Sequence, residues 1–204
     1  GIASAMLYLH SCNIIHRDLK PANVLIDKFL FPKIADFGLS KIKHSKFENS
    51  NVKSINCIKG TPVYMSPEIW EKAEYSKSSD VYAFAFIVYE IVTNRKPFKD
   101  SFYLQIPLKL KEGYRPEFNK DIPKSYLNLI TSCWTDDPNL RPSFDSILDR
   151  LKTDDGFITE KVDKEKYHKY IDYIDNFKVS FDEFKIVNFF NIYSKIKKIG
   201  KKQL

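Results

Sequence analysis

The chain has 204 residues, of which 43% are hydrophobic and 15% aromatic, and its formal net charge at pH 7 is +7. This length provides one sizeable hydrophobic core with a helical appendage but not two large domains, and the apolar content excludes a largely disordered polypeptide. The positive charges are spread along the chain, so the composition predicts no nucleic-acid binding.

The cysteines and the longest apolar run bear on three further features: disulfide bonds, a zinc site and a membrane span. Cys12, Cys57 and Cys133 lie far apart, without the spacing of zinc ligands, so the sequence predicts neither a disulfide framework nor a structural zinc site. Their scatter favours a reducing, cytoplasmic setting, and we interpret Cys57 as an ordinary loop cysteine. The longest apolar run, residues 81–89, is far shorter than the roughly 20 residues of a membrane-spanning helix, so no transmembrane span is predicted.

The first predicted element is a helix that starts at the beginning of the chain. Ile2, Met6 and Leu9 have the spacing of a helix with one face in a core, yet no capping residue or acidic first turn precedes them. Because the first residue is Gly1 rather than methionine, we expect the sequence to begin inside a longer protein. The alternative is a native protein trimmed after synthesis.

Two short segments that follow carry groups suited to phosphate chemistry. The first, HRDLKPANVL, starts at His16 and holds an acid, two cations and an amide; eighteen residues after Asp18, a second acid, Asp36, stands in IADFGLS. Gly38 in that segment permits backbone conformations closed to other residues. Phosphoryl transfer to a hydroxyl needs a carboxylate to accept the proton, oxygen ligands for Mg²⁺ and a cation to offset the phosphate charge. We interpret His16 itself as a packing residue.

These ordered motifs, His-Arg-Asp, Lys-Pro-x-Asn and Asp-Phe-Gly, resemble the signature of the eukaryotic protein kinases. The resemblance implies that Asp18 is the catalytic base and that Lys20 neutralises the transferred phosphate. It also implies that Asn23 and Asp36 hold magnesium ions, so the expected cofactors are ATP and Mg²⁺ and the expected partners are a nucleotide and a protein substrate. Arg17 would contact a phosphorylated or acidic activation segment.

The segment GTPVYMSPEIW resembles the end of a kinase activation segment. It has Ser-Pro-Glu at residues 66–68, where the family usually has Ala-Pro-Glu, and Thr61 would shape the pocket for the acceptor hydroxyl. Between Asp36 and this segment lie the candidate phosphorylation sites Ser50 and Ser54, whose phosphate would pair with the arginine of the catalytic loop.

The central predicted helix follows Ser-Ser-Asp at residues 78–80, which we interpret as a helix cap, and it is apolar on nearly all sides. By resemblance it is the central helix of the large lobe, and Asp80 would brace the catalytic loop from beneath. In CWTDDPNLRPSFDSIL, Arg141 would form a buried ion pair with Glu68. The fold expected is therefore mainly helical (α+β), like a kinase C-terminal lobe, with short β-hairpins around the catalytic loop.

The choice of acceptor hydroxyl follows from two further patterns. Lys20-Pro21 resembles the serine/threonine kinases, whereas the pattern from Cys133 to Phe144 resembles the tyrosine-kinase-like branch, so dual specificity stays open. We interpret the chain as a protein serine/threonine kinase.

The resemblance ends near residue 151, so the expected domains are a partial kinase domain, residues 1–151, and a helical extension of unknown role, residues 152–204. Apolar residues at helical spacing predict two helices in the extension, and its lysine-rich end is interpreted as solvated. No Gly-rich phosphate loop, strand lysine or hinge is recognised. We therefore expect a large-lobe fragment that is inactive alone, the alternative being a truncated lobe that serves as a protein-binding or decoy module.

Overall fold

The computed structural model describes residues 1–42, 58–99, 101–118, 122–160 and 162–181 of the chain. It contains two compact units, one formed by residues 1–159 and a second that begins at Glu160. All the candidate site residues belong to the first unit.

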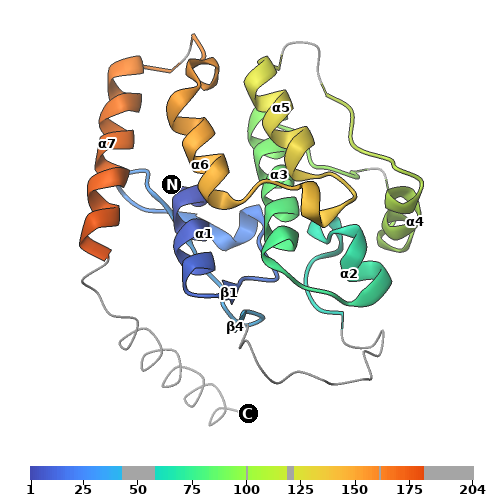
Figure 1. Cartoon of the computed structure of the whole chain (residues 1–204). Coiled ribbons are helices and arrows are strands. Elements are labelled where there is room, and N and C mark those ends of the chain that lie inside the picture. The colour runs from blue at the N-terminus through green and yellow to red at the C-terminus, as the bar shows by residue number, and fades with distance from the viewer. Residues whose placement is uncertain (43–57, 100, 119–121, 161, 182–204) are drawn as a thin grey trace. The chain divides into compact units, whose positions relative to one another are not determined.

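Helices make up most of the first unit (Figure 1). Its helices are α1 (Ile2–Ser11), α2 (Pro67–Lys72), α3 (Lys77–Thr93), α4 (Ile106–Lys111), α5 (Lys124–Cys133) and α6 (Phe144–Thr153). Its strands are β1 (Ile14–Ile15), β2 (Val24–Ile26), β3 (Pro32–Ile34) and β4 (Lys41–Ile42). β1 pairs with β4 and β2 pairs with β3, both antiparallel. The expectation of a mainly helical fold with short strand pairs around the catalytic loop is confirmed.

The core is built around α3, which is buried on nearly all sides, as its apolar sequence predicts. α5 packs along α3, and α1 packs against α6. Phe144 connects these two pairs of helices, because its ring lies 5.0 Å from the His10 ring of α1 and 5.3 Å from the Phe84 ring of α3, measured between centroids. The central helix is therefore fixed from several directions and can position residues at its amino-terminal end.

The predicted cap of this helix was wrong in position. α3 begins at Lys77, one residue before the Ser-Ser-Asp segment, with Ser76 as its N-cap. The Ser76 hydroxyl accepts a hydrogen bond from the Ser79 N–H, and the Ser79 hydroxyl accepts one from the Ser76 N–H. This reciprocal capping box places residues 78–80 in the first turn, which leaves the carboxylate of Asp80 free to serve the catalytic loop.

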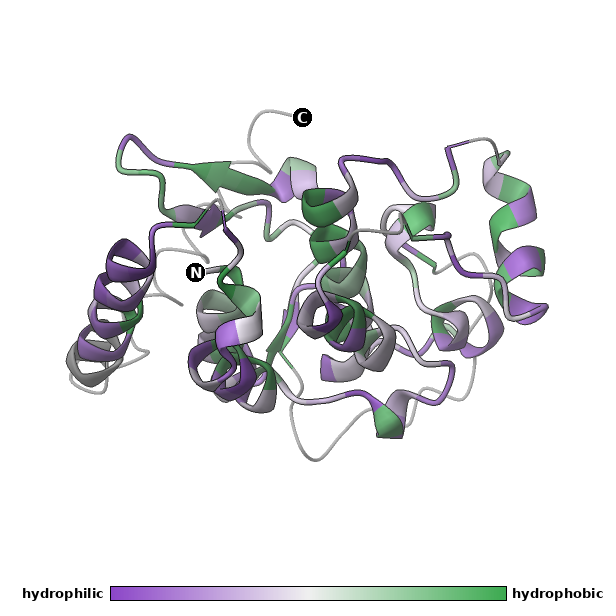
Figure 2. Ribbon diagram, turned by 90° about the horizontal axis from the view of Figure 1, so that it is seen from above, coloured by the Kyte–Doolittle hydropathy of each residue, from purple (hydrophilic) through white to green (hydrophobic). Residues whose placement is uncertain are grey.

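The second unit contains α7 (Lys164–Phe181), whose largely hydrophilic residues are purple in Figure 2, in contrast to the apolar strand β2 of the first unit. This helix lies where the first helix of the extension was predicted. The second predicted helix falls in residues 182–204, outside the described residues. Among the described helices, none is long and apolar enough to cross a membrane.

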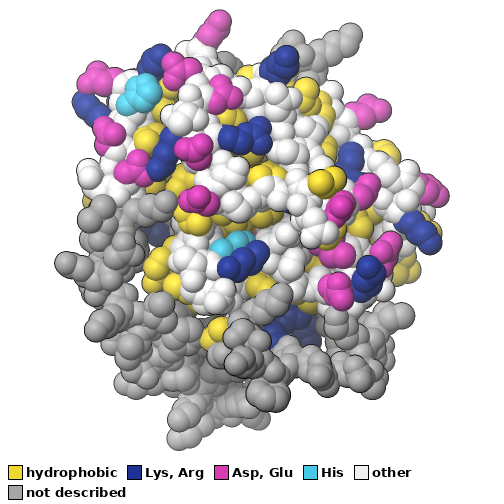
Figure 3. Space-filling view, viewed as in Figure 1, with side chains coloured by type: hydrophobic (Ala, Val, Ile, Leu, Met, Phe, Trp, Pro, Cys, Tyr) yellow, Lys and Arg dark blue, Asp and Glu magenta, His cyan; other side chains and the backbone are white. Residues whose placement is uncertain are grey.

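The face of the molecule in Figure 3 carries lysine and arginine side chains interspersed with acidic ones. Among the described residues on that face, the lysine and arginine side chains do not gather into one patch. This agrees with the even spread of charge along the sequence.

Cys133, the last residue of α5, is fully buried against the core, and burial raises the pKa of its thiol to about 12. Because only the thiolate is nucleophilic, a rise from the ordinary value of 9.0 leaves about 10³-fold less reactive sulfur at pH 8. We expect iodoacetamide to label Cys133 about 10³-fold more slowly in the native protein than in urea, measured by peptide mass spectrometry. Half-buried Cys12 serves as the internal reference; equal native rates at both cysteines would contradict the structure.

Candidate active site

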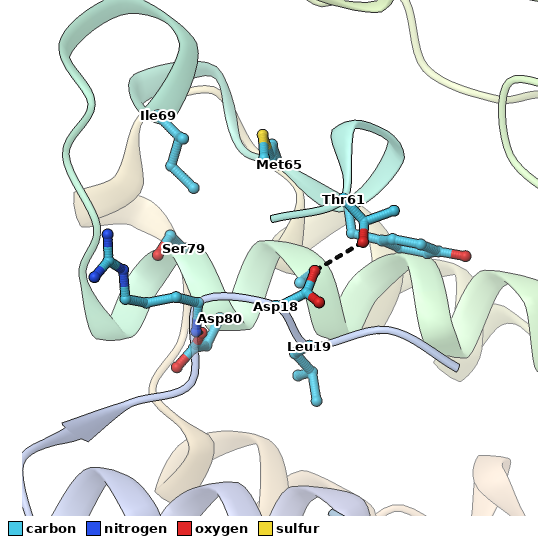
Figure 4. Close-up of a pocket in the computed structure, with 10 residues that line it drawn as sticks. Asp18, Leu19, Thr61, Met65, Ile69, Ser79 and Asp80 are labelled. Atoms are coloured by element: carbon cyan, nitrogen blue, oxygen red, sulfur yellow. Dashed lines mark hydrogen bonds between the residues drawn. The ribbon is translucent and has the colours of Figure 1, made fainter. Parts of the chain in front are cut away.

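The catalytic loop runs between β1 and β2 and brings a carboxylate, an ammonium group and a hydroxyl into mutual contact. Asp18 Oδ1 accepts a hydrogen bond of 2.8 Å from Thr61 Oγ1, as Figure 4 shows, and its Oδ2 lies 2.8 Å from Lys20 Nζ. Lys20 Nζ also donates to Thr61 Oγ1 at 2.8 Å. Two segments more than forty residues apart in sequence thus meet at one carboxylate.

Asn23 lies next to this carboxylate, at the end of a single 3₁₀ turn that Pro21 begins. Its side-chain amide donates a hydrogen bond of 2.8 Å to the Asp18 backbone oxygen, with a longer contact of 3.4 Å to Oδ2. Because the amide nitrogen faces Asp18, the amide oxygen faces the other way. The residue is buried, so its orientation is fixed.

Asp36 is held beside Asn23 by the backbone of the β2–β3 pair. The Ala35 N–H, one residue before Asp36, donates to the Asn23 backbone oxygen at 2.8 Å. Asp36 is exposed and has a φ of 59°, a conformation that costs a non-glycine residue on the order of 1 kcal/mol. Gly38 N–H donates to its Oδ1 at 3.2 Å, and a Cβ at Gly38 would lie 3.1 Å from the same oxygen. A side chain at position 38 would therefore press on this carboxylate.

Asn23 and Asp36 offer an amide oxygen and a carboxylate, which are the kinds of donor that magnesium prefers. Mg²⁺ prefers hard oxygen ligands and is usually held by one or two carboxylates together with phosphate oxygens and water, rather than by a complete protein cage. Within the described part of the chain, no group of three or more His, Cys, Asp or Glu side chains could hold a metal ion.

Asp80 supports the catalytic loop from the first turn of α3. Its carboxylate accepts hydrogen bonds from the His16 N–H at 2.8 Å and the Arg17 N–H at 3.0 Å, and it lies 2.9 Å from His10 Nε2. Only 1% of Asp80 is exposed. These bonds hold Arg17 at a φ of 71°, a left-handed conformation that non-glycine residues rarely adopt. His16 is fully buried and its Nε2 contacts the Ala35 oxygen at 3.0 Å.

Arg141 and Glu68 form a buried, bidentate ion pair. Arg141 Nη1 donates to Glu68 Oε1 at 2.7 Å and Nη2 donates to Oε2 at 2.9 Å. The same guanidinium donates to three backbone oxygens, those of Ser78, Thr135 and Asp136. The pair thereby joins α2, the start of α3 and the loop before α6.

Tyr64 connects the segment that carries Thr61 to the last turn of α3. Its hydroxyl donates a hydrogen bond of 2.7 Å to Glu90 Oε1. Desolvation by burial, with a contribution from this bond, raises the pKa of Tyr64, so the hydroxyl remains a donor at neutral pH. Desolvation also raises the pKa of Glu90 above its ordinary value.

Arg17 directs its guanidinium toward the ring of Tyr75, with 4.0 Å between the guanidinium carbon and the ring centroid. The candidate phosphorylation sites Ser50 and Ser54 lie outside the described residues. Neither Tyr75 nor His10 was predicted as a site residue. The only signal available was for His10, which follows Met6 by four residues on the buried face of the first helix.

The fold and the order of these residues along the chain are those expected of a protein kinase domain. A model of the family described as protein tyrosine and serine/threonine kinase matches residues 1–151, and the chain belongs to this family.

Three relatives illustrate the similarity. A probable LIM domain-containing serine/threonine-protein kinase of Dictyostelium discoideum is 40% identical over 164 residues, which is 80% of this chain and 16% of that protein. An RGS domain-containing serine/threonine-protein kinase of the same organism is 40% identical over 153 residues, 75% of this chain and 13% of that protein. A dual specificity protein kinase, also from D. discoideum, is 38% identical over 155 residues, 74% of this chain and 29% of that protein. The chain spans less than a third of the length of each.

Proposed function

We propose that the chain carries the large lobe of an ATP-dependent kinase that transfers phosphate to serine and threonine hydroxyls of proteins. The contact of Asp18 with Thr61 and Lys20 is the observation that supports this most directly. A substrate hydroxyl near Asp18 would give its proton to the carboxylate, and Lys20 would offset the charge on the transferred phosphate. Thr61 holds both groups in place and shapes the acceptor side of the site.

Asn23 and Asp36 are the residues that would hold the magnesium of Mg–ATP. Bound there, the metal would neutralise charge on the phosphates. Asn23 contributes a fixed amide oxygen, whereas Asp36 contributes an exposed carboxylate whose conformation Gly38 permits. In this proposal, the protein's own contribution would be to hold the base, the cation and two oxygen ligands close to the transferred phosphate.

Two observations support serine and threonine as the acceptor residues. The catalytic loop contains Lys-Pro, and most of the relatives are named as serine/threonine kinases. The relative named as a dual specificity kinase supports a second candidate, transfer to tyrosine as well. The scattered cysteines favour a cytoplasmic site of action.

We further propose that residues 1–204 alone bind nucleotide weakly and transfer phosphate negligibly. The six glycines of the chain stand at least 22 residues apart, so none belongs to a glycine-rich phosphate loop. In this family, positioning of ATP supplies most of the catalysis. The alternative, a kinase-like lobe that serves as a binding or decoy module, uses the same fold without phosphate transfer.

The test is to express the protein from its complete coding sequence and to follow transfer of labelled γ-phosphate to peptides that offer serine, threonine or tyrosine. We expect Mg²⁺-dependent labelling of the serine and threonine peptides, loss of labelling in excess EDTA, and negligible labelling by residues 1–204 alone. Labelling of the tyrosine peptide as well would establish the dual specificity candidate. A protein that labels none of the peptides and retains its fold would support the binding module instead.

A further inference from the structure

Tyr75 lies in the short loop between α2 and α3 and contacts both sides of the candidate site. Its hydroxyl donates a hydrogen bond of 2.6 Å to the backbone oxygen of Lys59 and accepts one of 2.7 Å from the Lys59 N–H. Its ring lies beneath the Arg17 guanidinium at 4.0 Å. One side chain thus connects the catalytic loop to the segment that carries Thr61.

The contact with the Tyr75 ring stabilises the partly buried guanidinium of Arg17. The Nε atom of Arg17 is buried and has no hydrogen-bond partner within the part of the chain that the structure describes. The negative face of an aromatic ring attracts a guanidinium, and this attraction offsets part of the cost of burying Nε without a hydrogen bond. Since Asp80 holds the backbone N–H of Arg17 from below, the residue is fixed by its backbone on one side and by its side chain on the other.

The contact with Lys59 fixes the chain two residues before Thr61. Between them, Gly60 has a φ of +126°, and a Cβ there would lie 3.0 Å from the Arg17 backbone oxygen. The segment therefore passes directly against the catalytic loop at this point. With both the N–H and the oxygen of Lys59 bound by one hydroxyl, little freedom remains for Thr61 to leave the Asp18 carboxylate and the Lys20 ammonium group.

We propose that Tyr75 is a positioning residue that clamps the end of the activation segment onto the catalytic loop and thereby sets the acceptor side of the site. The proposal rests on the proposed kinase function for its catalytic consequence. Arg17 would then have two roles. Besides any contact with a phosphorylated or acidic segment, its guanidinium would bind the ring of Tyr75, which occupies one of its faces.

The clamp is tested directly by hydrogen exchange, because the Lys59 amide is itself bonded to the Tyr75 hydroxyl. Tyr75→Phe removes the hydroxyl and keeps the ring, and it should speed exchange of the Lys59 amide about 5- to 10-fold, as expected for the loss of one hydrogen bond. Tyr75→Leu removes both contacts and should also speed exchange at Thr61. Tyr126→Phe is the matched control: it loses a hydroxyl bond to the Phe157 oxygen and should leave Lys59 unchanged.

The catalytic consequence is measured on the protein from its complete coding sequence. We expect kcat toward a serine peptide to fall about 5- to 10-fold in Tyr75→Phe, matching the exchange effect, and further in Tyr75→Leu, with the KM for ATP unchanged. An unchanged Lys59 exchange rate in Tyr75→Phe would overturn the clamp, and faster exchange with an unchanged kcat would overturn its positioning role. Absence of phosphate transfer in the unsubstituted protein would count against the kinase function, while the exchange rates would still decide the clamp.

Discussion

Replacing Asp18 by asparagine is expected to lower kcat about 10²- to 10⁴-fold, the usual contribution of a positioned general base. Asparagine has nearly the same shape and can still accept the hydrogen bond from Thr61, but it cannot take a proton from a substrate hydroxyl. The Asp18 side chain is 9% exposed and the Lys20 side chain 23%. Loss of this partly buried ion pair should therefore also lower stability, but by less than the ~3–5 kcal/mol of a fully buried pair, because the Lys20 ammonium group still reaches water. The loss of activity should therefore appear without a comparable loss of fold.

The measurement is steady-state transfer of phosphate to a serine peptide by the protein expressed from its complete coding sequence, together with urea unfolding of both forms. Asp27→Asn is the matched control, because Asp27 also pairs with a lysine, Lys33, at 3.5 Å, but lies in the turn between β2 and β3. We expect kcat of Asp27→Asn to stay within about twofold of the unsubstituted protein, as for a surface ion pair remote from the chemistry. Equal kcat values for the two variants would show that Asp18 is not the base.

Local sequence patterns were sufficient for the first helix and for the burial of the central one. A helix that is apolar on nearly all sides has to be buried, and α3 is. The periodicity of the first residues likewise predicts α1, with Met6 and Leu9 in the core. These features depend on neighbours a few residues away, and so they can be read from a single segment.

Features that depend on the approach of distant segments could not be derived in this way. The 2.8 Å contacts at Asp18 involve Thr61, 43 residues away, and only the order of the family motifs suggested that the two belong together. Tyr75 was missed for the same reason, since its partners Arg17 and Lys59 lie on segments that meet only in the folded chain. The start of α3 was placed at the wrong serine because Ser76 and residues 78–79 offer the same capping chemistry within one turn.

Replacing Arg141 by alanine is expected to lower the free energy of unfolding by about 3–5 kcal/mol, the typical cost of breaking a buried ion pair from one side. The Arg141 side chain has no exposed surface, and Glu68 is only 11% exposed at its side chain. Without the guanidinium, both carboxylate oxygens lose buried hydrogen bonds and three backbone oxygens lose partly buried ones. Urea unfolding followed by far-UV circular dichroism measures the change.

Companion variants separate the buried charge from other effects of the substitution. Arg141→Lys keeps the charge but loses the forked geometry, so its unfolding free energy should lie between those of the unsubstituted protein and Arg141→Ala. The double variant Glu68→Ala/Arg141→Ala should be less destabilised than the sum of the two single variants, because no unpaired charge remains buried. Lys33→Ala, which breaks the exposed pair with Asp27, should leave the free energy of unfolding nearly unchanged, because solvent and salt screen such a pair. If Arg141→Ala cost no more than Lys33→Ala, the ion pair would not be the link that holds α2 to the start of α3.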